Sequence, residues 1–317
     1  MKKRIITYIW LIPVLFVLIA FIGVVGVKNG WIGNMPPLDD LQNPINRFAS
    51  QVISSDGKVL GTWSKSENRI FVDHDSISSH MFDALVATED VRFFEHSGID
   101  VRALGRAIVK TGIMQQKSAG GGSTITQQLA KNLFPRGKRD SNKIVRTAKL
   151  IVSKFKEWIT ALKLEYNYTK EEIVAMYLNT VEYGSNAFGI KSAAATFFGK
   201  TPSELNLQEA AVLVGVVNAP TRYSPVRNPE NALRRRNTVL KRIEAAGGIT
   251  KEECDSLSAL PITLNYRPVS HNYGRATYFR EMLRLTMNAQ RPKRRNFYTT
   301  WDYEQACKEY DENPLIG

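Results

Sequence analysis

Two adjacent acids, Glu89 and Asp90, precede His96 in the segment EDVRFFEHSG, which spans residues 89–98. A carboxylate placed beside a sugar hydroxyl can take its proton, and such general-base help accelerates a reaction by about 10²- to 10⁴-fold. The alternative interpretation of Glu89 is a surface glutamate near the end of a helix. For His96, the alternative is a structural hydrogen-bonding role. Taken alone, the segment indicates that general-base chemistry is possible without establishing it.

A second segment, GGGSTITQQLAKN at residues 120–132, combines glycines, small hydroxyls, two glutamines, a lysine and an asparagine. Three glycines allow backbone N–H groups to approach an anion closely. Amides and hydroxyls can hydrogen-bond sugar or phosphate oxygens. A triple glycine by itself is weak evidence for any function, so the value of this segment lies in its whole length. It is typical of a site that holds phosphate and saccharide groups.

Lys154 and Glu157 form a third candidate pair. Residues three apart lie on the same face of a helix, so an ordinary ion pair is the simplest explanation. Between residues 131 and 163 the chain has ten Lys or Arg against two Asp or Glu. This local excess suits an anionic ligand or membrane surface, although a solvated helix face is the default interpretation.

The first two segments, in this order, resemble the peptidoglycan glycosyltransferase domain of class A penicillin-binding proteins and monofunctional transglycosylases. The resemblance covers roughly residues 47–245. It implies that Glu89 is the general base and Glu157 the second catalytic carboxylate, acting on the phosphate–sugar linkage or holding Mg²⁺ or another divalent cation. No organic cofactor is expected. The substrate-binding residues implied are Asp90, Phe93, His96, Gly122, Ser123, Thr124, Gln127, Gln128, Lys131, Asn132 and Lys154.

The third segment departs from the family pattern, which is Arg-Lys-x-x-Glu. Ser153 stands where the family has arginine, and a serine cannot supply a fixed cationic fork. We therefore expect either that Arg146 or Lys149, earlier on the same predicted helix, takes over, or that the site relies more on Lys131 and Lys154.

Hydrophobic periodicity predicts a mostly α fold with a small β element. An Asp-Gly turn between two apolar runs predicts a β-hairpin over residues 51–60, and residues 69–72 could add a third strand. The resemblance implies a two-lobed, lysozyme-like helical domain. A basic and apolar stretch from Arg102 to Met114 suits an interfacial helix, and ordinary core packing is equally compatible. Helices are predicted at residues 80–88, 143–166, 170–179, 207–217, 231–246 and 250–257.

The predicted organisation begins with a cytoplasmic tail at residues 1–4 and a transmembrane helix at residues 5–27. Positive residues before that apolar run place the N-terminus in the cytoplasm, and a cleaved signal peptide is the rival interpretation. The net charge is +13, which favours an anionic partner or membrane. A connector at 28–50, a glycosyltransferase domain at 51–248 and a connector at 249–317, towards a further C-terminal domain, complete the prediction. Cys254 and Cys307 have no metal-like spacing.

The resemblance implies an enzyme that polymerises lipid II into β-1,4-linked glycan, inverting the anomeric carbon and releasing undecaprenyl pyrophosphate. The implied location is a bacterial inner membrane, spanned once, with the catalytic domain outside. Expected partners are lipid II, the growing glycan strand, membrane lipids and other cell-wall synthesis and division proteins, with no nucleic acid. The alternatives are a lysozyme-like hydrolase or lytic transglycosylase, and a non-catalytic membrane scaffold.

Overall fold

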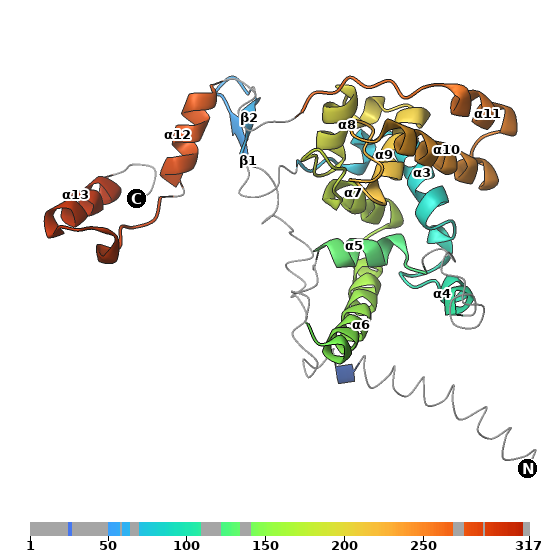
Figure 1. The fold of residues 1–317 in the computed structure, drawn as a ribbon, viewed down its shortest axis with the longest axis horizontal. Coiled ribbons are helices and arrows are strands. Elements are labelled where there is room, and N and C mark those ends of the chain that lie inside the picture. The colour runs from blue at the N-terminus through green and yellow to red at the C-terminus, as the bar shows by residue number, and fades with distance from the viewer. Residues whose placement is uncertain are drawn as a thin grey trace, which may run out of the picture. The chain divides into compact units, whose positions relative to one another are not determined.

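The computed structural model describes residues 25–26, 50–57, 59–63, 70–108, 122–133, 141–268, 276–287 and 289–312. Two compact units are present. The first contains residues 69–268 with the first 46 residues, and the second contains residues 47–68 and 269–317. The mostly helical class predicted from the sequence is confirmed within the described residues (Figure 1).

All six helices predicted for the first unit are present among its described residues, whereas the helices at Ile125–Leu133 and Ile190–Phe198 were not predicted. The described helices are α3 (Ser79–Glu89), α4 (Val101–Ile108), α5 (Ile125–Leu133), α6 (Lys143–Asn167), α7 (Lys170–Thr180), α8 (Ile190–Phe198), α9 (Leu207–Val217), α10 (Pro229–Ala245) and α11 (Lys251–Ala259). Short 3₁₀ turns lie at His74–Ser76, Phe93–Glu95 and Pro202–Glu204. Helix α4 covers only the first part of the predicted stretch from Arg102 to Met114, and residues 109–114 lie outside the described residues.

The core of the first unit centres on α9, whose apolar residues are almost all buried. It packs against α3 and α10, and α5 packs against α6 and α7 (Figure 1). Local chemistry sets several helix starts. Reciprocal capping boxes satisfy N–H groups that have no partner inside the helix. They are formed by Thr169 with Glu172, by Asn206 with Glu209 and by Thr250 with Glu253.

Glycine is required where α7 meets α8. Gly189 has a φ of 78°, and a β-carbon there would lie 2.7 Å from the carbonyl oxygen of Asn179. Any other residue would clash with that backbone. Gly199 ends α8 in the left-handed conformation with a φ of 64°, as is common at helix C-termini.

The second unit contains the predicted hairpin, which is confirmed. Strands β1 (Ser50–Ile53) and β2 (Val59–Trp63) pair antiparallel around the turn, with Ser50 opposite Trp63 and an irregularity between Val52 and Ile53. The turn residue Gly57 has a φ of 77°. Helices α12 (Thr277–Met287) and α13 (Thr300–Asp311) and a short turn at Arg294–Asn296 complete the unit.

The predicted third strand is wrong over residues 70–72, which form no strand. The amide of Asn179 replaces a strand partner there. Val72 N–H donates to Asn179 Oδ1 at 3.0 Å, and Asn179 Nδ2 donates to Val72 O at 2.8 Å. Both backbone groups of Val72 are thereby satisfied without a sheet.

The predicted transmembrane helix falls on residues 5–27, of which only Val25 and Gly26 are described. Among the described helices, none has both the length and the apolar character needed to cross a membrane. Cys254 and Cys307 are each unpaired, and Cys254 is buried on α11.

Candidate active site

A polar cavity of about 1100 Å³ opens in the first unit, between α3, α5, α6, α7 and α10. It brings together most of the residues that the sequence predicted for the site. These lining residues are Glu89, Asp90, Gly122, Ser123, Thr124, Gln127, Gln128, Lys131, Asn132, Lys154 and Glu157. They come from segments far apart in the chain, so their convergence is a property of the fold.

Glu89 is the last residue of α3, and its side chain is 17% exposed. Gln128 Nε2 donates a hydrogen bond to Glu89 Oε2 at 2.9 Å. Arg235 Nη2 lies 3.8 Å from Glu89 Oε1. One carboxylate oxygen is thus held by an amide from α5, while the other lies near a cation from α10. Both carboxylate oxygens of Glu89 thus have polar neighbours, unlike those of a free surface glutamate.

The end of α3 is itself anchored by α10. Arg242 Nη1 donates to the carbonyl oxygen of Thr88, one residue before Glu89. The last carbonyls of a helix have no partner inside the helix, and a cation there also interacts favourably with the helix dipole. Arg242 therefore fixes the backbone that carries Glu89.

Thr124 links the second motif to the first. Its hydroxyl donates to Gly98 O at 2.7 Å and accepts the N–H of Gln127 at 3.2 Å, which caps the start of α5. Gln127 Nε2 also donates to Gly98 O, at 3.0 Å. The amide side chain of Gln127 therefore braces the two motifs, while Gln128, one residue later, faces Glu89.

Phe93 and His96 lie behind the cavity wall and are not among its lining residues. Phe93 is fully buried, and Lys170 Nζ lies 4.2 Å from the centre of its ring. The same Nζ donates to His96 O at 2.6 Å and pairs with Glu165 Oε2 at 2.7 Å. Both residues of the first motif thus support the site from behind; direct substrate contact by either stays a prediction.

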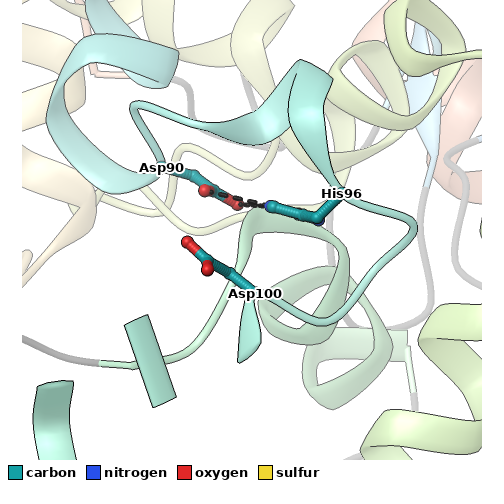
Figure 2. Close-up of side chains that lie close together, drawn as sticks. All are labelled: Asp90, His96 and Asp100. Carbon is teal, nitrogen blue, oxygen red and sulfur yellow. Dashed lines mark hydrogen bonds and ion pairs between the residues drawn. The ribbon is translucent and has the colours of Figure 1, made fainter. Parts of the chain in front are cut away.

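Asp90, His96 and Asp100 converge at the cavity wall, and each offers one ligand-type atom within 4.8 Å of the others (Figure 2). The bonds they make explain this grouping without a metal. His96 Nε2 donates to Asp90 at 3.1 and 3.2 Å, and Arg92 Nη2 donates to Asp100 Oδ2 at 2.6 Å. We interpret the cluster as an internal brace, because Asp90 Oδ2 also accepts the Ile125 N–H at the start of α5.

The pKa values of the two aspartates in this brace are shifted in opposite directions. Burial raises the pKa of Asp90, against the lowering effects of His96 and of the Ile125 N–H. Burial would also raise the pKa of Asp100, but the Ala103 N–H and Arg92 outweigh it, so that pKa lies below its ordinary value. Asp100 therefore remains ionised, and it caps α4 through Ala103.

Glu157 differs from the surface helix pair that its spacing with Lys154 suggested. Its side chain is only 6% exposed, and Lys154 Nζ lies 2.8 Å from Glu157 Oε2. Lys154 Nζ also donates to Ser123 Oγ at 2.9 Å. This contact ties α6 to the glycine-rich segment and keeps a lysine and a carboxylate together at the cavity wall.

Sequence reasoning missed several cavity residues. Arg235 and Arg242 of α10, Arg106 of α4, Tyr177 of α7 and Glu182 all line it. The signal in the sequence was the amphipathic α10 pattern with three consecutive arginines, but that pattern does not say which arginine faces a site. The side chain of Arg235 packs against Gly215 of α9. A β-carbon added at this glycine would lie only 3.0 Å from Arg235 Cγ, so the glycine leaves space for the arginine.

Comparison with known proteins decides the family. A sequence model described as transglycosylase matches residues 56–244. The chain belongs to the transglycosylase family. Membership predicted from the two motifs is thereby confirmed, and the matched segment is a glycosyltransferase domain of the class A penicillin-binding protein type.

Several curated relatives are long penicillin-binding proteins. Penicillin-binding protein 1A of Aquifex aeolicus is 36% identical over 287 residues, which are 90% of this chain and 36% of that protein. The Escherichia coli protein of the same name is 32% identical over 284 residues, which are 90% of this chain and 32% of that protein. The transglycosylase chain thus spans about a third of the length of these relatives.

A solved structure of penicillin-binding protein 1A from Haemophilus influenzae also aligns with the transglycosylase. It is 24% identical, with a TM-score of 0.40, over 80% of this chain and 25% of that chain.

Proposed function

We propose that this chain polymerises lipid II into glycan strands of peptidoglycan. The observation that carries the proposal is one cavity that gathers two carboxylates, Glu89 and Glu157, with the cations Lys131 and Lys154. A glycosyl transfer from a pyrophosphate donor needs a base on the acceptor hydroxyl and positive charge at the leaving group. A cavity with acids alone would suit hydrolysis of a finished glycan better.

In the proposed reaction, Glu89 takes the proton from the 4-hydroxyl of the acceptor sugar. The resulting oxygen attacks the anomeric carbon of the donor, and the bond from that carbon to the pyrophosphate oxygen breaks. The configuration inverts, so an α-linked donor yields a β-1,4 linkage. Lys131 and Lys154 stabilise the negative charge that develops on the departing undecaprenyl pyrophosphate.

A divalent cation such as Mg²⁺ remains a proposal. The carboxylate assigned to it, Glu157, already pairs with the ammonium group of Lys154 at 2.8 Å, so a cation already faces this carboxylate. When bound, a divalent ion would supply further positive charge at the pyrophosphate.

The decisive experiment incubates the purified chain with labelled lipid II, with and without magnesium, and in parallel with finished cell wall. Growth of a glycan polymer from lipid II supports the proposal, and its dependence on magnesium decides the metal question. Release of fragments from finished wall without polymer growth would instead identify a hydrolase or lytic enzyme. The absence of both activities would favour a non-catalytic scaffold.

The substrate is lipid-linked, so we also propose that the protein works at the bacterial inner membrane, with its catalytic domain outside. Contacts with the growing strand, with membrane lipids and with other cell-wall synthesis and division proteins belong to the same proposal. Val101 on α4 is exposed, and Arg102 and Arg106 follow on the same helix. This combination suits contact with an anionic surface.

We expect residues 28–317, without the predicted anchor, to co-sediment weakly with vesicles. Each well-placed Lys or Arg contributes about 1 kcal/mol near an anionic surface. Sedimentation should therefore rise with anionic lipid and fall with salt. Arg102→Ala should weaken it, whereas Arg227→Ala, which removes an exposed arginine before α10, should not. Equal sedimentation with neutral and anionic vesicles would contradict the electrostatic contribution.

The structure also bears on which cations replace the family arginine at the position of Ser153. Ser153 Oγ donates to Lys149 O within α6, and neither Arg146 nor Lys149 is among the described residues that line the cavity. We therefore expect Arg146→Ala and Lys149→Ala to keep lipid II polymerisation within about twofold of the wild-type rate, and Lys131→Ala to lose more than about tenfold. A large loss in either α6 variant would show that those cations act at the site after all.

A further inference from the structure

Tyr177 lies on α7 and lines the cavity. Its side chain is almost completely buried. The hydroxyl donates to Gln128 Oε1 at 3.0 Å, and Gln128 Nε2 donates to Glu89 Oε2 at 2.9 Å. A continuous hydrogen-bond chain therefore runs from α7 through α5 to the end of α3.

The direction of this chain follows from the chemistry of its members. A carboxylate only accepts hydrogen bonds, whereas a glutamine amide has one donating and one accepting end. Gln128 supports an ionised Glu89 only when its NH₂ group faces the carboxylate, which leaves its carbonyl oxygen needing a donor. Burial, together with the negative charge of Glu89, raises the pKa of Tyr177, so its hydroxyl stays protonated and serves as that donor.

Other charged groups around Glu89 do not replace this contact. From α10, Arg235 Nη2 lies 3.8 Å from Glu89 Oε1, beyond hydrogen-bond distance, and Arg242 is bound to Thr88 O. Within the described part of the chain, the hydrogen bond from Gln128 is the one that orients the Glu89 carboxylate. The remaining charged groups of the cavity are Asp90, Arg92, Asp100, Arg106, Lys131, Lys154, Glu157 and Glu182.

We propose that Tyr177 is a positioning residue that sets the orientation of the Glu89 carboxylate through the amide of Gln128. The inference rests on the proposed function, since it assigns Glu89 the role of base. With Oε2 held by Gln128, the plane of the carboxylate is set and its other oxygen has a defined direction in which to accept the proton. Without the tyrosine hydroxyl, the amide can rotate and present its carbonyl oxygen to Glu89.

The test compares Tyr177→Phe with Tyr183→Phe in lipid II polymerisation. Tyr183 is a matched control because it is also buried, its hydroxyl lies 3.3 Å from Leu178 O, and it is not among the cavity-lining residues. We expect Tyr177→Phe to lower kcat about threefold to tenfold with an unchanged KM, as loss of one orienting hydrogen bond implies. Tyr183→Phe should retain the wild-type kcat.

A raised KM with normal kcat for Tyr177→Phe would make Tyr177 a substrate contact and overturn the proposal. A double-mutant cycle adds a second discrimination. In a Gln128→Met background, Tyr177→Phe should cause no further loss, because the intermediary is already gone. Independent, multiplying losses would show that Tyr177 does not act through Gln128.

A spectroscopic arm separates this inference from the proposed function. The side-chain NH₂ signal of Gln128 in an ¹⁵N-labelled protein is identified by its absence in Gln128→Met. It should shift in Tyr177→Phe and stay unchanged in Tyr183→Phe. An unmoved signal in Tyr177→Phe overturns the inference even if the wild type polymerises lipid II. A wild type without activity refutes the proposed function, and the spectra then decide the hydrogen-bond chain alone.

Discussion

Glu89→Gln should reduce lipid II polymerisation at least about 100-fold while the protein remains folded. The substitution removes the proposed proton acceptor but keeps the size and shape of the side chain. Gln128 can still donate to the new amide oxygen, and Arg242 still anchors Thr88. The local backbone should therefore persist, and the loss should appear in kcat. Rate measurements with labelled lipid II, together with thermal unfolding, separate these effects.

Glu95→Gln is the matched control for this variant. Glu95 belongs to the same motif and also lies near an arginine, with Arg102 Nη1 at 3.9 Å, but its side chain is 62% exposed. It is not among the residues that line the cavity. We expect near-normal activity for Glu95→Gln. If Glu89→Gln kept more than about a tenth of the wild-type rate, Glu89 could not be a base with the usual contribution.

Glu157→Gln should lower turnover more than about tenfold. The family resemblance implies that Glu157 acts on the phosphate–sugar linkage, and its charge holds Lys154 beside Ser123. An exposed helix pair contributes only about 0.5 kcal/mol to stability and nothing to catalysis. The burial of Glu157 removes that simple explanation. The measurement is single-turnover glycan formation compared with the wild type, with circular dichroism to establish that the variant is folded.

The chain contains a matched helix pair for comparison. Arg284 and Glu281 on α12 are also three residues apart and form an ion pair, but both are exposed and both belong to the second unit. Glu281→Gln should leave polymerisation unchanged. Equal activity for Glu157→Gln and Glu281→Gln would show that Glu157 belongs to an ordinary structural ion pair, and it would contradict the proposed catalytic role.

Much of the secondary structure could be predicted because it follows from local rules. The apolar run of α9, the capping pairs of α7 and α11, and the Asp-Gly turn of the hairpin each depend on neighbouring residues. Such features follow from backbone hydrogen bonding and side-chain periodicity over a few residues. The prediction of a third strand was wrong because the partner of that segment is not a strand. It was the side chain of Asn179, more than 100 residues away.

The two motifs by themselves identified the family, because a long run of specific residue types rarely arises without a shared site. They also pointed to Glu89 and the glycine-rich segment as the candidate site. Which side chains reach the cavity was decided by tertiary structure alone. Successive residues of a helix point about 100° apart. Of three adjacent arginines on α10, Arg234 bonds Asn231 on the exposed side, Arg235 approaches Glu89, and Arg236 is buried against Ser258 O. Identical residue types in one run thus receive three different roles, because only packing against α3, α9 and α11 determines which face meets solvent, cavity or core.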